Sequence, residues 1–136
     1  MIQKGGDMKS KKALVLDDND MILAVVEEIL TDTQFEVTTF SDPISFFAQK
    51  EELCCHSESE PCFDILITDN RMPGMTGLEF IEKLKSRGCK IADHRKAIIS
   101  GNISSEELDR AKKMNCKVFQ KPLPIAELIQ WSTDVR

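Results

Sequence analysis

Residues 63–74 read FDILITDNRMPG, and the interpretation of the whole chain starts from this stretch. The apolar run 65–67 is bounded by polar residues and then by Pro73 and Gly74, which predicts a fully buried strand of a parallel sheet. Such a strand carries Asp69 to its carboxyl end, where open α/β sheets bind their ligands. Asp69 is therefore a candidate site carboxylate, although a solvated aspartate in a turn explains the same residues. The other strands decide between these two interpretations.

Four other segments are also short, strand-like runs, and each is followed by a stretch with helical periodicity. Apolar and β-branched residues predominate in the runs 13–16, 35–40, 97–99 and 118–120. The run 35–40 is the most polar of them, as expected of an edge strand. Strands and helices that alternate over such short connections require right-handed crossovers and a parallel sheet covered on both faces. The sequence therefore predicts one doubly wound α/β domain, a (βα)5 unit, over residues 12–134, behind a flexible N-terminal tail at 1–11.

Local signals mark where several of these helices begin. Asn19 or Asp20 is available to cap the first helix. In a capping box, a Ser or Thr side chain and a Glu three residues later bond each other's backbone N–H. That spacing occurs at Thr76 with Glu79 and at Ser104 with Glu107. The polar segment 51–62 has no such pattern and is predicted to be a mobile connection.

Composition excludes several classes of protein. The chain has 136 residues, of which 41% are hydrophobic and 30% charged, and this fits one globular domain with a real core. Its net charge is −5 and it has no long Lys/Arg run, so direct binding of nucleic acid is not expected. No apolar stretch is long enough to span a membrane and no signal peptide is seen at the N-terminus. We therefore expect a cytoplasmic protein without membrane insertion.

The cysteines favour reduced thiols. There are five, an odd number scattered through a globular pattern, which does not indicate a disulfide framework. A metal site is an alternative for the cluster of Cys54, Cys55, His56 and Cys62. That cluster lacks the paired, short-spaced ligands of structural zinc modules, so surface or half-buried thiols are the preferred interpretation.

Four of the predicted strands end in residues with functional chemistry, namely Asp17 with Asp18, Asp69, Ser100 and Lys121. The ends of parallel strands share one edge of the sheet. Carboxylates on neighbouring strands can share a divalent cation such as Mg2+, and without one they repel each other until one takes up a proton. A hydroxyl and an ammonium group suit a tetrahedral oxyanion because both donate to negatively charged oxygens. The arrangement is predicted to bind a phosphoryl group.

Motifs at these strand ends resemble the signatures of response-regulator receiver domains, the CheY-like superfamily of two-component signalling. The matching motifs are LDDN at 16–19, ITDNRMPGMTG at 67–77, ISG at 99–101 and QKP at 120–122. The resemblance covers residues 12–132. It implies a flavodoxin-like five-stranded parallel sheet with strand order 2-1-3-4-5.

The resemblance also implies a role for each strand-end residue. The phosphoryl group would be carried by Asp69, the phosphoacceptor, and contacted by Ser100 and Lys121. Mg2+, or another divalent cation such as Mn2+, would be held by Asp17, Asp18, Asp69 and the backbone carbonyl of Arg71. The family typically has a cis peptide bond before the residue equivalent to Pro122.

A receiver domain is a phosphorylatable switch rather than a conventional enzyme. The resemblance implies a histidine kinase or histidine phosphotransfer protein as donor, and in-line transfer to Asp69 that depends mainly on positioning and charge neutralisation. The acyl phosphate is labile, so attack by water sets the lifetime of the signal. Surfaces around the fourth helix, fifth strand and fifth helix would reach a downstream protein, and a phosphorylation-dependent dimer is left open. We expect no output domain in this chain.

Two other functions are consistent with parts of the pattern. A phosphatase with an aspartyl nucleophile would usually carry a second acid two residues later, where this chain has Arg71. A receiver-like protein-interaction module that works without phosphorylation is the other alternative. The intact Asp69, Ser100 and Lys121 argue against it.

Some positions depart from the pattern of the family. Gly101 stands where Ala is most common, Val118 stands where Tyr or Phe is common, and the span between the second helix and the third strand is long. Val118 cannot make the aromatic rotamer change through which many receivers couple their hydroxyl residue to the surface, and Phe119 is expected on the opposite side of the strand. Arg71 and Asn102 flank the expected phosphoryl site. We hypothesise that Arg71 changes the acyl-phosphate lifetime, although an arginine merely solvated at the rim is an equal alternative.

Overall fold

The structure, a computed structural model, describes residues 11–50 and 63–135 of the chain. Strands and helices alternate along these residues as predicted. The strands are β1 (Lys11–Leu16), β2 (Phe35–Phe40), β3 (Ile65–Asp69), β4 (Lys96–Ser100) and β5 (Lys117–Gln120). The helices are α1 (Asp20–Asp32), α2 (Pro43–Lys50), α3 (Gly77–Ser86), α4 (Ser105–Lys113) and α5 (Ile125–Val135). A short 3-10 helix, η2 (Asp93–Arg95), precedes β4 and was not predicted.

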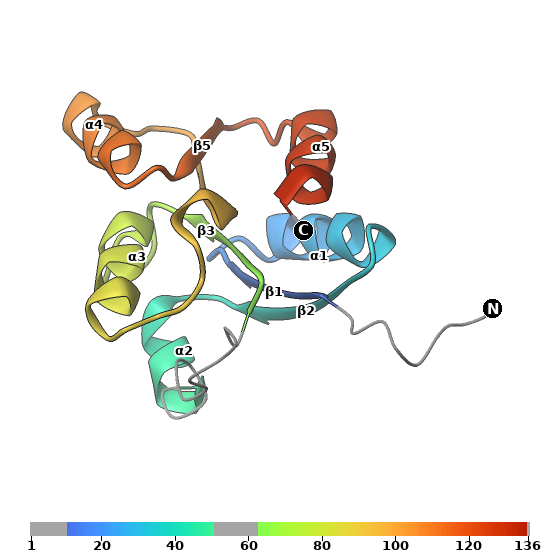
Figure 1. Cartoon of the computed structure of the whole chain (residues 1–136), viewed down its shortest axis with the longest axis horizontal. Helices are drawn as coiled ribbons and strands as arrows, with labels where there is room; N and C mark the ends of the chain where they lie inside the picture. The colour runs from blue at the N-terminus through green and yellow to red at the C-terminus, as the bar shows by residue number, and fades with distance from the viewer. Residues whose placement is uncertain (1–10, 51–62, 136) are drawn as a thin grey trace.

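The strands form one parallel sheet in the order β2-β1-β3-β4-β5 (Figure 1). The predicted fold class and the strand order implied by the resemblance are both confirmed. In the strand register, Leu16 of β1 pairs with Thr68 of β3, and Ser100 of β4 pairs with Gln120 of β5. The residues that follow these positions therefore meet at the carboxyl edge of the sheet.

Helices cover both faces of the sheet, with α1 and α5 on one face and α2, α3 and α4 on the other (Figure 1). Side chains alternate between the faces as the two-residue period of a strand requires. In β1, Leu14 and Leu16 pack toward α2 and α3, and Val15 packs toward α1 and α5. In β5, Val118 lies on the face covered by α2, α3 and α4, and Phe119 lies on the face covered by α1 and α5. The predicted opposite orientation of Val118 and Phe119 is confirmed.

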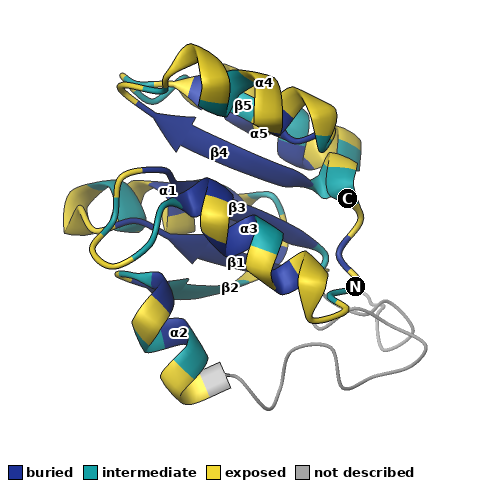
Figure 2. Cartoon of the chain, turned by 90° about the vertical axis from the view of Figure 1, so that its left-hand side faces the viewer, coloured by how far each residue is buried: buried dark blue, intermediate teal, exposed yellow. Residues whose placement is uncertain are grey.

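Burial is greatest in the middle of the sheet. Every residue of β3 and of β4 is buried, and β4 is seen as a dark blue strand in Figure 2. The edge strands β2 and β5 include exposed positions. The edge position predicted for the polar run 35–40 is confirmed. Because β3 is covered on both faces, Asp69 at its end projects from a fixed part of the core.

The helix starts follow the local signals in the sequence. Asn19 is the N-cap of α1, and its side chain accepts hydrogen bonds from the N–H groups of Met21 and Ile22. Both capping boxes are formed, with Thr76 before α3 and Ser104 before α4. These caps fix the loops that join the carboxyl edge of the sheet to the helices.

Some predictions concern segments outside the described residues. The mobile connection at 51–62 and the cluster of Cys54, Cys55, His56 and Cys62 belong to this group. The domain bounds 12–134 and the tail at 1–11 stay predictions, with β1 beginning at Lys11. In the part of the chain that is described, no helix has the length and apolar character needed to cross a membrane.

Candidate functional site

The turn after β3 is tight and depends on a glycine. The Thr68 hydroxyl donates to the backbone carbonyl of Asp69 over 2.8 Å, and the N–H of Gly77 donates to the carbonyl of Asn70 over 2.9 Å. A Cβ at position 77 would overlap the carbonyl oxygen of Asp69. Gly77 is therefore needed for α3 to begin this close to the end of β3, and this closeness holds the Asp69 backbone in place.

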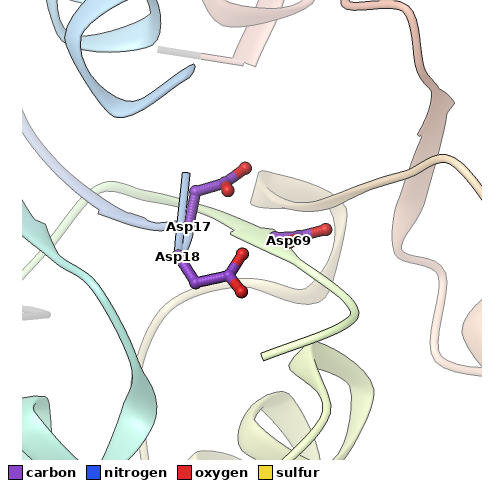
Figure 3. A group of neighbouring side chains, drawn as sticks. All are labelled: Asp17, Asp18 and Asp69. Carbon is purple, nitrogen blue, oxygen red and sulfur yellow. The ribbon is translucent and has the colours of Figure 1, made fainter. Parts of the chain in front are cut away.

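Three carboxylates meet at the ends of β1 and β3. One oxygen each from Asp17, Asp18 and Asp69 lies within 4.8 Å of the others. Figure 3 shows Asp17 and Asp18 coming from the end of β1 and Asp69 from the end of β3, with their carboxylates directed to the same side. Asp17 and Asp69 are buried, at 2% and 5% exposure, while Asp18 is exposed. The structure thus brings together the three acids predicted from separate motifs.

Lys121 pairs with both buried carboxylates. Its Nζ lies 3.4 Å from Oδ1 of Asp69 and 3.6 Å from Oδ2 of Asp17. The lysine follows β5 directly, its backbone N–H donates to the carbonyl of Ser100 over 2.9 Å, and the peptide bond to Pro122 is cis. A Cβ at Gly101 would lie 3.7 Å from the Lys121 Cβ, an ordinary contact, so packing against Lys121 does not require glycine there.

The charges of this cluster are incompletely balanced. The pKa of Asp69 is raised to about 6, chiefly by burial and next by the neighbouring Asp17 carboxylate, while Lys121 opposes both. Burial likewise raises the pKa of Asp17 above its ordinary value. A single ammonium group thus faces two buried carboxylates and the exposed Asp18. A cation with oxygen ligands would supply the missing positive charge, and this donor set fits a hard divalent ion.

Ser100 lies at the same edge, at the end of β4. It is 1% exposed, and its Oγ accepts the backbone N–H of Asn102 over 3.1 Å. This bond occupies a lone pair of the hydroxyl oxygen and leaves its proton available to donate. Ser100 therefore supplies a hydroxyl group beside the carboxylates, one residue beyond the pairing of Asp69 with Ile99.

Arg71 and Asn102, predicted to flank the site, contact each other. One guanidinium nitrogen of Arg71, Nη2, donates to the carbonyl of Asn102 over 3.2 Å and lies 3.4 Å from Oε1 of Glu107. The side chain of Arg71 is 57% exposed. It therefore bridges the loops that follow β3 and β4, at the rim of the site.

Asn70 and Glu107 contribute to the site in a way that sequence analysis missed. Asn70 is fully buried, and its Nδ2 donates to Oε2 of Glu107 over 3.0 Å. The sequence indicated Glu107 only as half of a capping box. The signal for Asn70 was its position directly after the strand-end aspartate, but its partner is 37 residues away. Such a contact becomes visible only once the loop after β3 and the first turn of α4 are placed at the same edge of the sheet.

Comparison with known proteins agrees with this geometry. The family model described as "Response regulator receiver domain" matches residues 13–132. The two-component response regulator ORR5 of Oryza sativa subsp. japonica is 29% identical over 118 residues, which cover 87% of this chain and 80% of the rice protein. The transcriptional regulatory protein FlgR of Helicobacter pylori is 28% identical over 113 residues. Those residues are 82% of this chain and 26% of FlgR, so the chain spans about a quarter of that relative.

Solved structures share the fold. A response regulator receiver domain protein from Clostridium thermocellum superposes with a TM-score of 0.74 at 25% identity, covering 92% of this chain and 93% of that one. The chemotaxis protein CheY4 of Vibrio cholerae gives 0.73 at 24% identity, covering 94% and 100%. The acidic pocket with its lysine and the family match together make this chain a member of the response regulator receiver domain family, the CheY-like domains of two-component signalling.

Proposed function

We propose that this domain accepts a phosphoryl group on Asp69 from a phosphohistidine of a histidine kinase or histidine phosphotransfer protein. The observation that carries the proposal is the position of the Lys121 ammonium, which lies within 3.6 Å of the carboxylates of both Asp17 and Asp69. A lysine held there is placed to pair with negative charge added at Asp69. Members of the family typically are not conventional enzymes, and the product here is a modified form of the domain itself.

Transfer forms a bond between a carboxylate oxygen of Asp69 and phosphorus while the bond from phosphorus to the imidazole nitrogen breaks. The electron pair of the broken bond returns to the imidazole. Lys121 pairs with one non-bridging oxygen, and the Ser100 hydroxyl donates to another, because its oxygen is already oriented by the N–H of Asn102. These groups act by position and charge, which is the main requirement of phosphoryl transfer.

A divalent cation, Mg2+ or a similar ion such as Mn2+, belongs to this proposal. The residues that would hold it are Asp17, Asp18, Asp69 and, through its backbone carbonyl, Arg71. The three carboxylates are the acidic triad typical of the family, and their oxygens are the ligands that such ions prefer. When bound, the ion neutralises charge on the transferred group and on the buried carboxylates. The raised pKa of Asp69 supports this assignment, since a nearby cation favours the ionised nucleophile.

The rim of the site suits a protein as phosphoryl donor. Three large apolar side chains are exposed in the first turns of helices that begin at the carboxyl edge: Met21 of α1 at 77%, Ile44 of α2 at 56% and Ile125 of α5 at 49%. Side chains exposed at the starts of three helices that share this edge offer apolar surface to a protein partner. We infer that the apolar face of the donor packs on this rim while its histidine reaches the carboxylates.

Incubation with Mg2+ and acetyl phosphate, followed by intact-mass measurement, tests the proposal. The wild-type protein should gain the mass of one phosphoryl group, and Asp69→Asn should gain none. Asp20→Asn is the matched control, because Asp20 is an exposed acid of the same segment that lies outside the triad. A folded wild-type protein that takes up no phosphoryl group would contradict the proposal and favour a module that works without phosphorylation.

A further inference from the structure

Glu107 makes a set of contacts that its capping role does not require. Its Oε1 accepts the N–H of Ser104 over 3.1 Å, which is the capping bond at the start of α4. Its Oε2 accepts Nδ2 of Asn70 over 3.0 Å, and Nη2 of Arg71 lies 3.4 Å from Oε1. The side chain is only 14% exposed. One carboxylate therefore joins the first turn of α4 to the two residues that follow Asp69.

Asn70, which donates a hydrogen bond to Glu107, also donates one to Asp69. Its backbone N–H donates to Oδ1 of Asp69 over 2.8 Å, the same oxygen that lies 3.4 Å from Nζ of Lys121. The other groups of Asn70 are held by α3, since its Oδ1 accepts the N–H of Leu78 and its carbonyl accepts that of Gly77. Because Asn70 is fully buried, it has little freedom to change orientation unless these partners move.

We propose that Glu107 is a positioning residue which, through Asn70, orients the Asp69 carboxylate and makes the first turn of α4 respond to the state of Asp69. This inference rests on the proposed phosphorylation of Asp69. It adds the residues through which phosphorylation affects the first turn of α4. A phosphoryl group on Asp69 changes the charge and geometry at the oxygen that Asn70 contacts. The hydrogen bond from Asn70 to Glu107 transmits that change to the N-terminal cap of α4. By linkage, the hydrogen bond of Glu107 to Asn70 in turn influences the Asp69 carboxylate.

Glu107→Gln breaks this connection with little change of shape. A glutamine has one oxygen where the carboxylate has two, so it cannot accept Asn70 on one oxygen and Ser104 on the other. Glu106→Gln is the matched control, because it removes the same charge from the same turn at an exposed position. Ser104→Ala is a second control that removes the hydroxyl half of the capping box and leaves the Glu107 carboxylate in place.

The first readout is the rate of labelling by acetyl phosphate at saturating Mg2+, followed by intact mass. We expect Glu107→Gln to label about fivefold more slowly, the equivalent of one net hydrogen bond. Glu106→Gln should stay within about twofold of wild type, as surface changes usually do. Ser104→Ala should also stay within about twofold, because it leaves the hydrogen bond of Asn70 to Glu107 in place. Equal rates for Glu107→Gln and Glu106→Gln would overturn the inference, and so would equal slowing in Glu107→Gln and Ser104→Ala, since capping alone would then explain the effect.

The second readout is hydrogen exchange of the amides in the first turn of α4, with and without phosphorylation. Wild type should show a change of protection on phosphorylation, and Glu107→Gln should show none even when fully labelled. A merely structural role of Glu107 would alter protection equally in both states, and that result would overturn the inference. If wild type takes up no phosphoryl group, the proposed function fails first. If it labels and Glu107→Gln behaves like wild type, only the present inference fails.

Discussion

At the amino edge of the sheet, Lys96 is fully buried at the start of β4, and its Nζ lies 3.4 Å from Oδ1 of Asp93, whose other oxygen lies 3.0 Å from Nζ of Lys85. At the carboxyl edge, one lysine, Lys121, faces two buried aspartates. The surrounding charges shift the pKa of a carboxylate in opposite directions at the two edges. Its lysine partners hold the pKa of Asp93 below the ordinary value, whereas burial and repulsion raise the pKa of Asp69.

This contrast separates charges that stabilise a fold from charges that await a ligand. The carboxylate of Asp93 is in its preferred ionised form without any ligand, and it accompanies a lysine that could not otherwise be buried. The carboxylates at the other edge are costly to ionise unless a cation joins them. Clustered groups whose pKa values are shifted against ionisation are typical of functional sites. The amino edge is therefore expected to matter for stability and the carboxyl edge for chemistry.

Removal of Lys96 should give the largest change in stability. We expect Lys96→Ala to lower the free energy of unfolding by about 3 kcal/mol, because it opens a cavity and removes the buried partner of Asp93. Lys85→Ala, which removes the exposed partner of Asp93, should cost less than about 1 kcal/mol. Urea unfolding measures both values. Equal small losses would show that the burial of Lys96 contributes little.

The two edges should also differ in the sign of their pH dependence. The pKa of Asp69 is raised from 3.8 to about 6, so between these pH values the folded protein binds more protons than the unfolded chain and loses stability as pH rises. Without divalent ions, the stability of Asp69→Asn relative to wild type should therefore grow by about 2 kcal/mol from pH 4 to pH 7.

Asp93→Asn is the matched variant at the other edge. The pKa of Asp93 is lowered by its hydrogen bond to Lys85, so its stabilisation is present above pH 3.8 and is lost as pH falls further. This variant should be less stable than wild type at neutral pH, with the difference shrinking in acid. Denaturant unfolding at neutral pH, near pH 4 and at pH values below 3.8 measures the stability of both variants. The same sign for Asp69→Asn and Asp93→Asn would contradict the comparison.

Addition of Mg2+ should increase the difference between the two edges, because it reduces charge repulsion only among the carboxylates at the carboxyl edge. At tenfold excess over its dissociation constant, the ion should stabilise the wild-type protein by about 1.4 kcal/mol. Asp18→Asn should lose this increment while folding normally, because Asp18 is exposed. Asp20→Asn should keep the increment. Thermal unfolding with and without Mg2+ decides the matter, and full stabilisation of Asp18→Asn would remove that residue from the ligand set.

The smallest effect is expected at the rim. Arg71 bridges the loops after β3 and β4 through contacts that are largely exposed, and such contacts are worth less than about 1 kcal/mol. Arg71→Ala should therefore change the rate of aspartyl-phosphate hydrolysis by at most about fivefold. Loss of the label after removal of the phosphodonor measures this rate. An unchanged rate would leave Arg71 as a solvated arginine with no part in the lifetime.

The sequence was informative where structure depends on neighbours along the chain. The capping boxes at Thr76 and Ser104 follow from spacing alone, and the burial of residues 65–67 follows from their apolar character. The meeting of Asp17, Asp18 and Asp69 was predictable because parallel strands end at one edge of a sheet. These features repeat a local or topological rule.

Other features depend on contacts between distant segments and could not be predicted. Lys96 is typical of a solvated strand end in the sequence, and only the η2 turn that brings Asp93 against it makes its burial tolerable. The bond of Asn70 to Glu107 requires the loop after β3 and the first turn of α4, which are far apart in the sequence, to meet. The incomplete charge balance at Asp69 also requires burial and distances, which composition does not give.

The central claim is that the Asp69 carboxylate is the group that carries phosphate. The most direct test is to label the protein with acetyl phosphate and Mg2+, reduce the acyl phosphate with borohydride, and locate the reduced residue by peptide mass spectrometry. Reduction converts a phosphorylated aspartate into homoserine. We expect this conversion at Asp69 alone, and conversion at Asp17 or Asp18 instead, or at no carboxylate of a folded protein, would contradict the account.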